Sequence, residues 1–410
     1  MRLVRVEVGQ RSETVRRANL SAIIRGLHDA GPMSRSQIVA ATGLTRTAIG
    51  GLVGELVAAR LVQEAPAVRQ GTPGRPSPVV GIVRDRAVVL AIETLVDSLS
   101  VASVGLDGRV IVQERVTRAR DERSVDAVVA HIASMAAAVR ARTPAPIVGV
   151  GVAVAGVVRR SDGQVAMAPN LGWIDEPFGE RLAAALALNV PVTVANDADL
   201  GALAEHLRGA GVGVNDLIYV SGEVGVGGGA IVGGRPLDGL AGYGGEIGHL
   251  PVNPGGSPCR CGSIGCWETE VGEGALLSLA GLSPDAGRAG IDLVLREAQA
   301  GNQVAVAALE HVGRWLAVGL AALVNILNPQ LIVLGSMHGR IYPAIRHTVE
   351  AGLSARALPA PRALVRIVPA TLGADAPLIG AAELALEPIL VDPAGFMARP
   401  APVQRLASAS

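Results

Sequence analysis

The sequence is poor in aromatic residues and cysteine, and it carries no net charge. Only three Trp, three Tyr and two Phe occur among 410 residues, so Ala, Val, Leu and Ile must fill most of the core. A hydrophobic fraction of 50% nevertheless excludes a disordered chain. The length exceeds one ordinary core and suits a small domain followed by a larger one with two lobes.

A long apolar run of the kind that spans a membrane is also missing. The best candidate, Leu316 to Leu334, is interrupted by Asn325, Asn328 and Pro329. The pattern of a charged start, an apolar segment and a small-residue cleavage site does not occur either. We therefore expect a cytoplasmic protein without a membrane partner, whose thiols stay reduced.

The zero net charge hides a difference between the first 80 residues and the rest. Those 80 residues contain eleven Arg and five acidic residues, a balance of +6, which leaves −6 for the remainder. A basic head on an acidic body favours phosphate binding at one end. A charge excess is also typical of a solvated surface, so it does not decide the question alone.

The first 80 residues have the pattern of a winged helix-turn-helix. We predict helices over residues 18–30, 35–42 and 45–59, with Gly43 in the turn between the second and the third. This order of helix, glycine-containing turn and helix is typical of a DNA-binding helix-turn-helix. The alternative is a three-helix packing module that does not contact DNA.

Two short strands, predicted near residues 61–64 and 78–80, would form a wing around a Gly/Pro-rich tip at 69–76. In such domains the start of the last helix faces base edges, and wing arginines reach phosphates or the minor groove. The segment Pro73–Pro78 would then be a stiff hinge to the body. The predicted DNA contacts are Ser34, Arg35, Thr45, Arg46, Thr47, Arg69 and Arg75.

Residues 81–390 have the pattern of a duplicated α/β domain. Strand-like runs are followed by a helix over 125–139 and another strand over 147–154, and a second such set begins at Leu217. Two α/β lobes that meet at a cleft would place polar residues at strand ends, such as Asn196-Asp197, beside a ligand.

The C-terminal part is predicted to contain two long helices, over 303–326 and from Asp375 onward, around a strand at 330–334. The last twenty residues, 391–410, are rich in Ala, Pro and Ser. We expect them to be a loose tail without an assigned function.

The three cysteines lie within eight residues, from Cys259 to Cys266, and His249 lies ten residues before the first. Three thiolates and one imidazole form a closed tetrahedral set, typical of a structural Zn²⁺ site that leaves no position for a reactive water. The alternative is three buried free cysteines. We expect a zinc ion that organises the fold and does not catalyse, with the ligands His249, Cys259, Cys261 and Cys266.

Gly245-Glu-Ile-Gly-His249 and Cys259-Arg-Cys-Gly-Ser-Ile-Gly-Cys266-Trp-Glu268 resemble the signature of the ROK family of repressors and sugar kinases. The resemblance extends to the Gly-rich stretch 224–229 and to the helix and strand at 325–335. The N-terminal segment resembles the winged helix of the family's repressors. This implies a winged helix-turn-helix at 1–80 and a two-lobed, actin-like and ribonuclease-H-like sugar-kinase fold at 81–390.

The same resemblance implies a sugar site. In the family's kinases the Asp of an Asn-Asp pair is the base that activates a sugar hydroxyl, and the matching residue here is Asp197. Carboxylates and amides at strand ends bind hydroxyls through paired, charge-assisted hydrogen bonds. For Asn170 a loop-capping role is an equal alternative. The sugar-binding candidates are Asn170, Asn196, Asp197, Glu246, His249 and Glu268.

The first phosphate loop argues against kinase activity. The family pattern is Asp-x-Gly-Gly-Thr, whereas this chain has Glu93-Thr-Leu-Val-Asp97, so both glycines are lost and Asp97 adds a negative charge. The second loop keeps its glycines but contains Glu223 and Val224. We expect little or no ATP binding and a loss of kinase activity, with Asp197 as a sugar ligand.

These features predict a transcriptional regulator that binds a DNA operator and responds to a sugar or sugar phosphate, most simply a repressor of carbohydrate-metabolism genes. A helix-turn-helix protein of this kind usually acts as a homodimer or homotetramer. Sugar would change lobe closure, and the hinge would pass this to the DNA-binding heads, with release and tightening both open. The alternatives are an active ATP-dependent sugar kinase and a regulator controlled by a partner protein.

Overall fold

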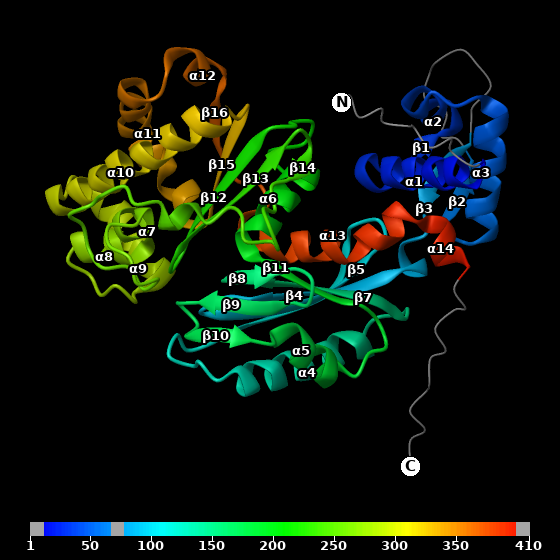
Figure 1. Ribbon diagram of the computed structural model, residues 1–410, viewed down its shortest axis with the longest axis horizontal. Coiled ribbons are helices and arrows are strands. Elements are labelled where there is room, and N and C mark those ends of the chain that lie inside the picture. Colours follow the sequence, from blue (N-terminus) through cyan, green and yellow to red (C-terminus); the bar gives the residue numbers. More distant parts are fainter. Residues whose placement is uncertain (1–11, 67–77, 399–410) are drawn as a thin grey trace, which may run out of the picture.

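The computed structural model describes residues 12–66 and 78–398. It consists of a head, formed by the N-terminal segment, and two α/β lobes (Figure 1). The described residues of the head form three helices and a sheet of strand order β1-β3-β2. Its elements are α1 Ser12–Ala30, β1 Met33–Ser34, α2 Arg35–Thr42, α3 Arg46–Ala58, β2 Val62–Ala65 and β3 Val79–Ile82.

The helix boundaries in the head follow from local capping. Ser34 Oγ accepts a hydrogen bond from the Gln37 backbone N–H at 3.2 Å, and the Ser34 N–H donates to Gln37 Oε1 at 2.8 Å, which is a capping box. Thr45 caps α3, and Gly43 ends α2 with φ 69°. The predicted second and third helices are confirmed. Helix α1 begins six residues before the prediction, in turns that contain a Glu13–Arg16 ion pair but no apolar stripe.

The first lobe is built on a five-stranded mixed sheet of order β11-β7-β4-β5-β6. Strands β4, β5 and β6 are antiparallel, whereas β7 and β11 run parallel to β4. A second small sheet, β8-β9-β10, lies beside it. The elements are β4 Val88–Thr94, β5 Ser98–Gly105, β6 Val110–Thr117, α4 Val125–Ala141, β7 Ile147–Val154, β8 Val157–Arg159, β9 Gln164–Ala168, β10 Trp173–Glu176, α5 Phe178–Leu186 and β11 Val192–Asn196.

The second lobe repeats this arrangement, because its sheet has the order β14-β13-β12-β15-β16, with three antiparallel and then two parallel strands. The repeat confirms the predicted duplicated α/β fold. The elements are β12 Leu217–Gly222, β13 Val226–Val232, β14 Arg235–Pro236, α7 Trp267–Val271, α8 Glu273–Leu279, α9 Gly287–Gln299, α10 Gln303–Leu327, β15 Leu331–Gly335, α11 Ser336–Arg356, α12 Pro359–Leu364 and β16 Arg366–Pro369. The described residues also form three 3₁₀ turns, at Arg84–Arg86, Ile247–His249 and Gly373–Asp375.

Two helices between the lobes carry the connection to the head. Helix α6 (Asp197–Arg208) packs on strands of both large sheets and on α13 (Ala376–Val391). Helix α13 runs from the junction of the lobes to the head, where it meets α1 (Figure 1). One apolar core contains Leu20 and Leu27 of α1, Leu386 of α13 and Leu200 of α6. Head and body therefore share a continuous core.

Two sequence predictions need correction here. Residues 393–397 are not a loose tail, because they form the short helix α14 (Pro393–Met397), which packs on α1 and places Phe396 5.2 Å from the Arg86 guanidinium. The predicted hinge at Pro73–Pro78 lies largely outside the described residues. Since Val79–Ile82 pair with β2 in the wing, the passage from head to body follows at residues 83–87.

In the described part of the chain, α10 is the one helix that is long and apolar enough to cross a membrane. More than half of its apolar window is buried, and it packs against α7, α8, α9 and α11. Helix α10 is therefore a core helix of the second lobe. A location in the cytoplasm stays a prediction from the sequence.

Candidate functional site

A cavity that is open to solvent lies between the two lobes. The six predicted sugar-binding residues come from both lobes, and all six line this cavity: Asn170, Asn196, Asp197, Glu246, His249 and Glu268. A concave site with a few converging polar groups has the usual form of a small-molecule pocket. Sugar binding by these residues stays a prediction, but the structure brings them together.

Asn196 and Asp197 reach the cavity because β11 ends where α6 begins. Asn196 Oδ1 accepts hydrogen bonds from the backbone N–H groups of Ala198 at 2.8 Å and Asp199 at 3.1 Å. Its Nδ2 donates to the Gly156 carbonyl at 2.9 Å. Asn196 therefore caps α6, and this cap fixes the position of the Asp197 carboxylate. Burial, and next the charge of Glu223, raise the pKa of Asp197 to about 7.

Two glutamates complete the carboxylate wall of the cavity. Glu268 Oε2 accepts a hydrogen bond from the Val226 backbone N–H at 2.9 Å, which holds the side chain against β13. Burial, and next the charge of Glu268, raise the pKa of Glu246 to about 7. Desolvated carboxylates of this kind favour a ligand that supplies hydroxyl donors, because such donors replace the lost water.

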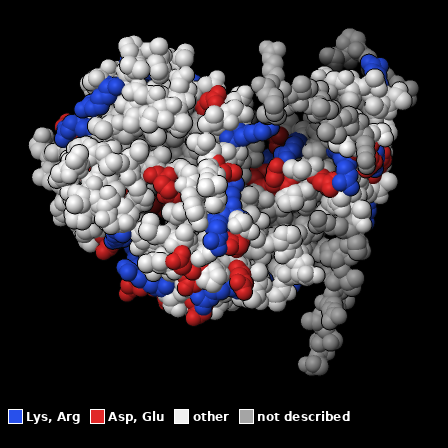
Figure 2. Space-filling model, viewed as in Figure 1, with Lys and Arg blue, Asp and Glu red and all other residues white. Residues whose placement is uncertain are grey.

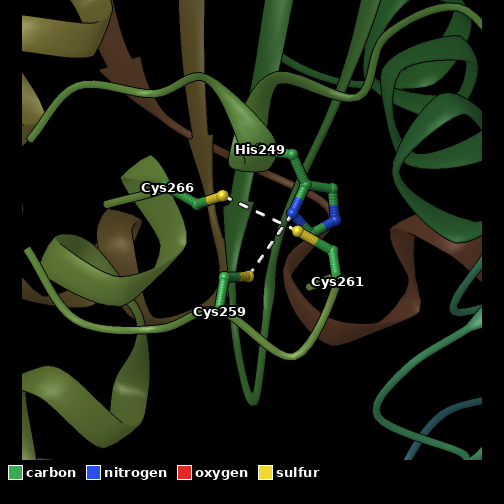
Figure 3. Close-up of side chains that lie close together, drawn as sticks. All are labelled: His249, Cys259, Cys261 and Cys266. Atoms are coloured by element: carbon green, nitrogen blue, oxygen red, sulfur yellow. Dashed lines mark hydrogen bonds between the residues drawn. The ribbon is translucent and has the colours of Figure 1, made fainter. Parts of the chain in front are cut away.

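The predicted metal ligands converge beside this wall, as Figure 3 shows for His249, Cys259, Cys261 and Cys266. The four ligand atoms lie within 4.8 Å of one another, with Cys259 Sγ 3.7 Å from His249 Nδ1 and Cys261 Sγ 3.7 Å from Cys266 Sγ. A tetrahedral ion with metal–sulfur bonds of about 2.3 Å requires ligand–ligand edges of about 3.8 Å. The cluster therefore fits a tetrahedral metal ion.

The loop that carries the predicted metal ligands, residues 249–266 (the metal loop), is anchored to the core of the second lobe by the residue that follows Cys266. Trp267 is fully buried, and its Nε1–H donates to the Trp315 carbonyl of α10 at 2.8 Å. A Cβ at Gly319 would lie 2.1 Å from the Trp267 ring, so only glycine lets α10 approach this closely. A metal ion here would thus order both the cavity wall and the packing of α10.

Arg260 is a site residue that the sequence analysis missed. Its Nη1 donates to Asn170 Oδ1 at 2.7 Å, which joins the metal loop of the second lobe to the β9–β10 loop of the first. A signal was present, because Arg260 is the one basic residue between Leu250 and Glu268. The partner could not have been foreseen, since the two residues are 90 positions apart.

Residues 93–97, where the family resemblance predicts an altered phosphate loop, form a strand end and a tight turn. Glu93 and Thr94 are the last residues of β4, and the turn to β5 contains only residues 95–97, of which Leu95 and Val96 are buried. Glu93 is fully buried and 3.1 Å from Arg115, and burial raises its pKa to about 8. Asp97, which we expected to repel phosphate, is paired with Arg120 at 3.0 Å.

The predicted DNA contacts divide into caps and exposed side chains. Ser34 and Thr45 serve as helix caps, and Arg35 Nε donates to Glu64 of β2 at 2.6 Å. Arg46 and Thr47, at the start of α3, are exposed. Arg69 and Arg75 lie outside the described residues. Contact of any of these residues with DNA stays a prediction.

Some of the arginines that make the head basic form ion pairs with acidic residues of the body. Arg25 Nη2 lies 2.6 Å from Glu387 of α13, and Arg17 Nη1 lies 3.3 Å from Asp392. Figure 2 shows basic and acidic side chains next to one another where the head meets the body. The charge asymmetry of the sequence therefore reflects domain docking as well as any attraction to phosphate.

Comparison with known proteins extends to both parts of the chain. A model of the ROK family matches residues 89–388. A xylose repressor of Bacillus spizizenii is 27% identical over 380 residues, which cover 92% of this chain and 97% of the repressor. A glucokinase of Halalkalibacterium halodurans is 34% identical over 255 residues, but these cover 58% of this chain and 76% of the glucokinase.

A solved structure of a ROK family transcriptional regulator, a homologue of the E. coli Mlc protein, has the same fold with a TM-score of 0.74. It is 24% identical and covers 93% of this chain and 98% of its own. The match to the xylose repressor covers 92% of this chain and so includes the head. The match to the glucokinase covers 58% of this chain. On the strength of the family match across the two lobes, the chain belongs to the ROK family.

Proposed function

We propose that this protein is a transcriptional repressor that binds DNA through residues 1–80 and a sugar through the cavity between the lobes of residues 81–390. The observation that carries the proposal is the combination of a capped helix-turn-helix with exposed Arg46 and Thr47 and a polar cavity lined by Asp197, Glu246 and Glu268. Full-length similarity to a xylose repressor supports it.

Loss of kinase activity belongs to the same proposal. Phosphate loops bind through backbone N–H groups that small residues leave accessible. Here the buried side chains of Leu95 and Val96 fill the turn, and the carboxyl group of Glu223 lines the cavity beside it. The Leu95 and Val96 side chains would keep a polyphosphate from the backbone N–H groups of the turn. Asp197 would then bind a sugar hydroxyl without deprotonating it for transfer.

We propose Zn²⁺ as the metal, in a structural role. Three thiolates and one imidazole match the usual zinc ligand set and leave no open coordination position. The ion would supply fixed geometry, holding the His249 ring at the cavity wall through Nδ1, so that Nε2 is left to meet a ligand.

The proposal is tested by a gel-shift assay of the purified protein on the DNA upstream of its own gene, at stated salt concentrations. Xylose and glucose are the first sugars to try, because the relatives include a xylose repressor and a glucokinase. We expect one sugar to change operator affinity and ATP to have no effect. DNA binding that no sugar alters would instead favour control by a partner protein.

The kinase alternative is tested separately by a coupled assay for ATP turnover with a panel of hexoses and pentoses. Turnover above that of an Asp197→Asn variant would overturn the proposed loss of activity. Assembly as a dimer or tetramer, expected from two-fold operators, is tested by light scattering of the eluting protein. A monomer at micromolar concentration would contradict it.

A further inference from the structure

Three segments that are far apart in the sequence meet in a buried cluster of charged and polar groups. Glu383 of α13 accepts at Oε2 from His28 Nε2 of α1, with a distance of 2.6 Å, and at Oε1 from Arg208 Nε of α6, at 2.8 Å. The side chain of His28 is 0% exposed, that of Glu383 2% and that of Arg208 18%. We call His28, Glu383 and Arg208 the buried triad.

The triad also holds the backbone at the end of α1. Arg208 Nη1 donates to the carbonyl of His28 at 2.6 Å, and His28 Nδ1 lies 2.6 Å from the carbonyl oxygen of Leu106. Burial alone would raise the pKa of Glu383, but hydrogen bonds and charge from His28 and Arg208 outweigh it and lower the pKa. Glu383 is therefore an ionised, buried group whose partners come from the head and from α6.

Helix α6 joins this triad to the sugar cavity. Asp197, its first residue, lines the cavity, and Arg208 is its last residue. At 1.5 Å per residue the two are separated by about 16 Å along the helix. Both ends are fixed, the first by the Asn196 cap and the last by Glu205, whose Oε1 accepts from the Leu372 N–H at 2.8 Å.

The packing of α6 leaves little room for independent movement. A Cβ at Gly380 would lie 2.0 Å from the Leu200 carbonyl, so the backbones of α13 and α6 touch. A Cβ at Gly229 of β13 would lie 2.8 Å from the Ala198 carbonyl, so the second lobe also contacts α6 directly. Elements packed this closely move together, because the interface between them cannot deform gradually. A change in lobe closure therefore has to move α6 or α13.

Among the described residues, the other polar contacts between α1 and the body do not reach α6. Arg25 pairs with Glu387 and Arg17 with Asp392, both at half-exposed positions, and Ser21 Oγ donates to the Leu390 carbonyl at 2.7 Å. These contacts hold the head against α13 and the residue that follows it. The triad differs because it ties α1 to α6 as well, through a buried charge.

We infer that the buried triad transmits the state of the sugar cavity to the DNA-binding head, with α6 as the connecting helix. The inference rests on the proposed function and names how that function is regulated. When sugar changes the position of α6 between the lobes, Arg208 moves relative to Glu383, and His28 with the end of α1 follows. The residues of the buried triad act by positioning α1 and contact neither the sugar nor the DNA. The coupling is the free energy by which sugar binding changes the affinity for DNA.

The experiment compares the wild type with Glu383→Gln, which keeps the size of the side chain but removes its charge. Glu387→Gln is the matched control, because Glu387 lies one turn further along α13 and its ion pair is half-exposed. For each full-length protein we measure sugar affinity by calorimetry, operator affinity with and without sugar, and hydrogen exchange of the α1 amides. His28→Gln is the second variant, used if Glu383→Gln does not fold.

For Glu383→Gln we expect the sugar-induced change in operator affinity to fall to less than about a third of the wild-type fold-change, while the sugar Kd stays within about threefold. Exchange of the α1 amides should increase at least about tenfold. The control should match the wild type in all three. A variant with wild-type coupling and wild-type α1 exchange overturns the inference.

Failure of the proposed function gives a different pattern. If no sugar alters operator binding by the wild type, the sensor proposal is wrong, and the triad is then judged in ligand-free protein. Glu383→Gln should in that case still change operator affinity by more than about threefold relative to Glu387→Gln, since the head's position on the body sets DNA binding. Equal operator affinities would overturn the inference as well.

Discussion

Arg260 donates a 2.7 Å hydrogen bond to Asn170, and so a residue between two predicted metal ligands contacts the opposite lobe. Asn170 also lines the cavity between the lobes, where its Nδ2 lies near the position that a Cβ at Gly225 would take. This hydrogen bond connects the metal loop to a residue of the cavity, and it also holds the two lobes at a fixed separation. It gives Asn170 an inter-lobe contact in addition to the two roles considered from the sequence.

Arg260→Ala should weaken sugar binding about three- to tenfold, because loss of the bridge removes a hydrogen bond that positions Asn170 and holds the lobes together. Calorimetry with the effector sugar measures this. Metal content should stay at the wild-type level, because the Arg260 side chain is not a ligand. Arg235→Ala, at an exposed position of β14, is the control. A sugar Kd equal to that of the control would remove Arg260 from the site.

Cys261→Ser should lose the metal and lower the melting temperature by more than about 5 °C, because an incomplete ligand set no longer holds the loop that carries Trp267. Metal analysis and thermal melting measure both effects. Chelator treatment of the wild type should reproduce the shift, whereas Ser257→Ala, exposed in the same loop, should not. Wild-type metal content in the Cys261→Ser protein would refute the proposed ligand set.

Asp197→Asn should stabilise the ligand-free protein, and more so at pH 8 than at pH 5. The pKa of Asp197 is raised to about 7 in the folded protein, while an unfolded chain ionises near 4. The folded state therefore holds a proton that the unfolded state has lost, and stability falls as the pH rises from about 4 to about 7. The Asp197→Asn variant has no ionisable group at this position, so its stability does not fall for this reason as the pH rises.

Thermal melting across that pH range, with the exposed Asp121→Asn as control, measures the difference. The control should follow the wild type at every pH. A gap between Asp197→Asn and wild type that does not change with pH would show that Asp197 has an ordinary pKa.

Arg46→Ala should weaken operator binding about three- to tenfold and make its salt dependence shallower, by about one unit in the slope of log Kd against log salt. The reason is that Arg46 is exposed at the start of α3, where a phosphate or base edge would lie. Arg314→Ala, exposed on α10 of the body, is the control. Affinity and slope equal to those of the control would exclude Arg46 from the DNA interface.

The features that the sequence predicted best depend on local interactions. Ser34 and Thr45 mark helix starts because each cap is a hydrogen bond from a backbone N–H three residues further on. The three cysteines lie so close in the sequence that their side chains could be expected to meet in space. The order of strands and helices followed from periodicity in the same way. The convergence of the six sugar-site candidates on one cavity was expected from the family resemblance.

The features that the sequence did not predict depend on contacts between distant segments. Arg208 and Glu383 are 175 positions apart, and His28 and Glu383 are 355 apart, so no spacing rule connects them. His28 gave no signal, because a basic residue in the last turn of a helix is common for local reasons. The helix at Pro393–Met397 was missed for a related reason, since its composition suits a tail and only packing on α1 orders it.

The shared core of head and body limits how the head can be exchanged. The apolar stripe of α1, with Leu20 and Leu27, has its partner in Leu386 and the neighbouring side chains of α13. A head grafted onto another ROK body would expose that stripe unless the matching face of α13 and Arg208 were transferred with it. In protein engineering, the unit to transfer with the proposed DNA-binding function is therefore the head together with α13, although the two lie at opposite ends of the sequence.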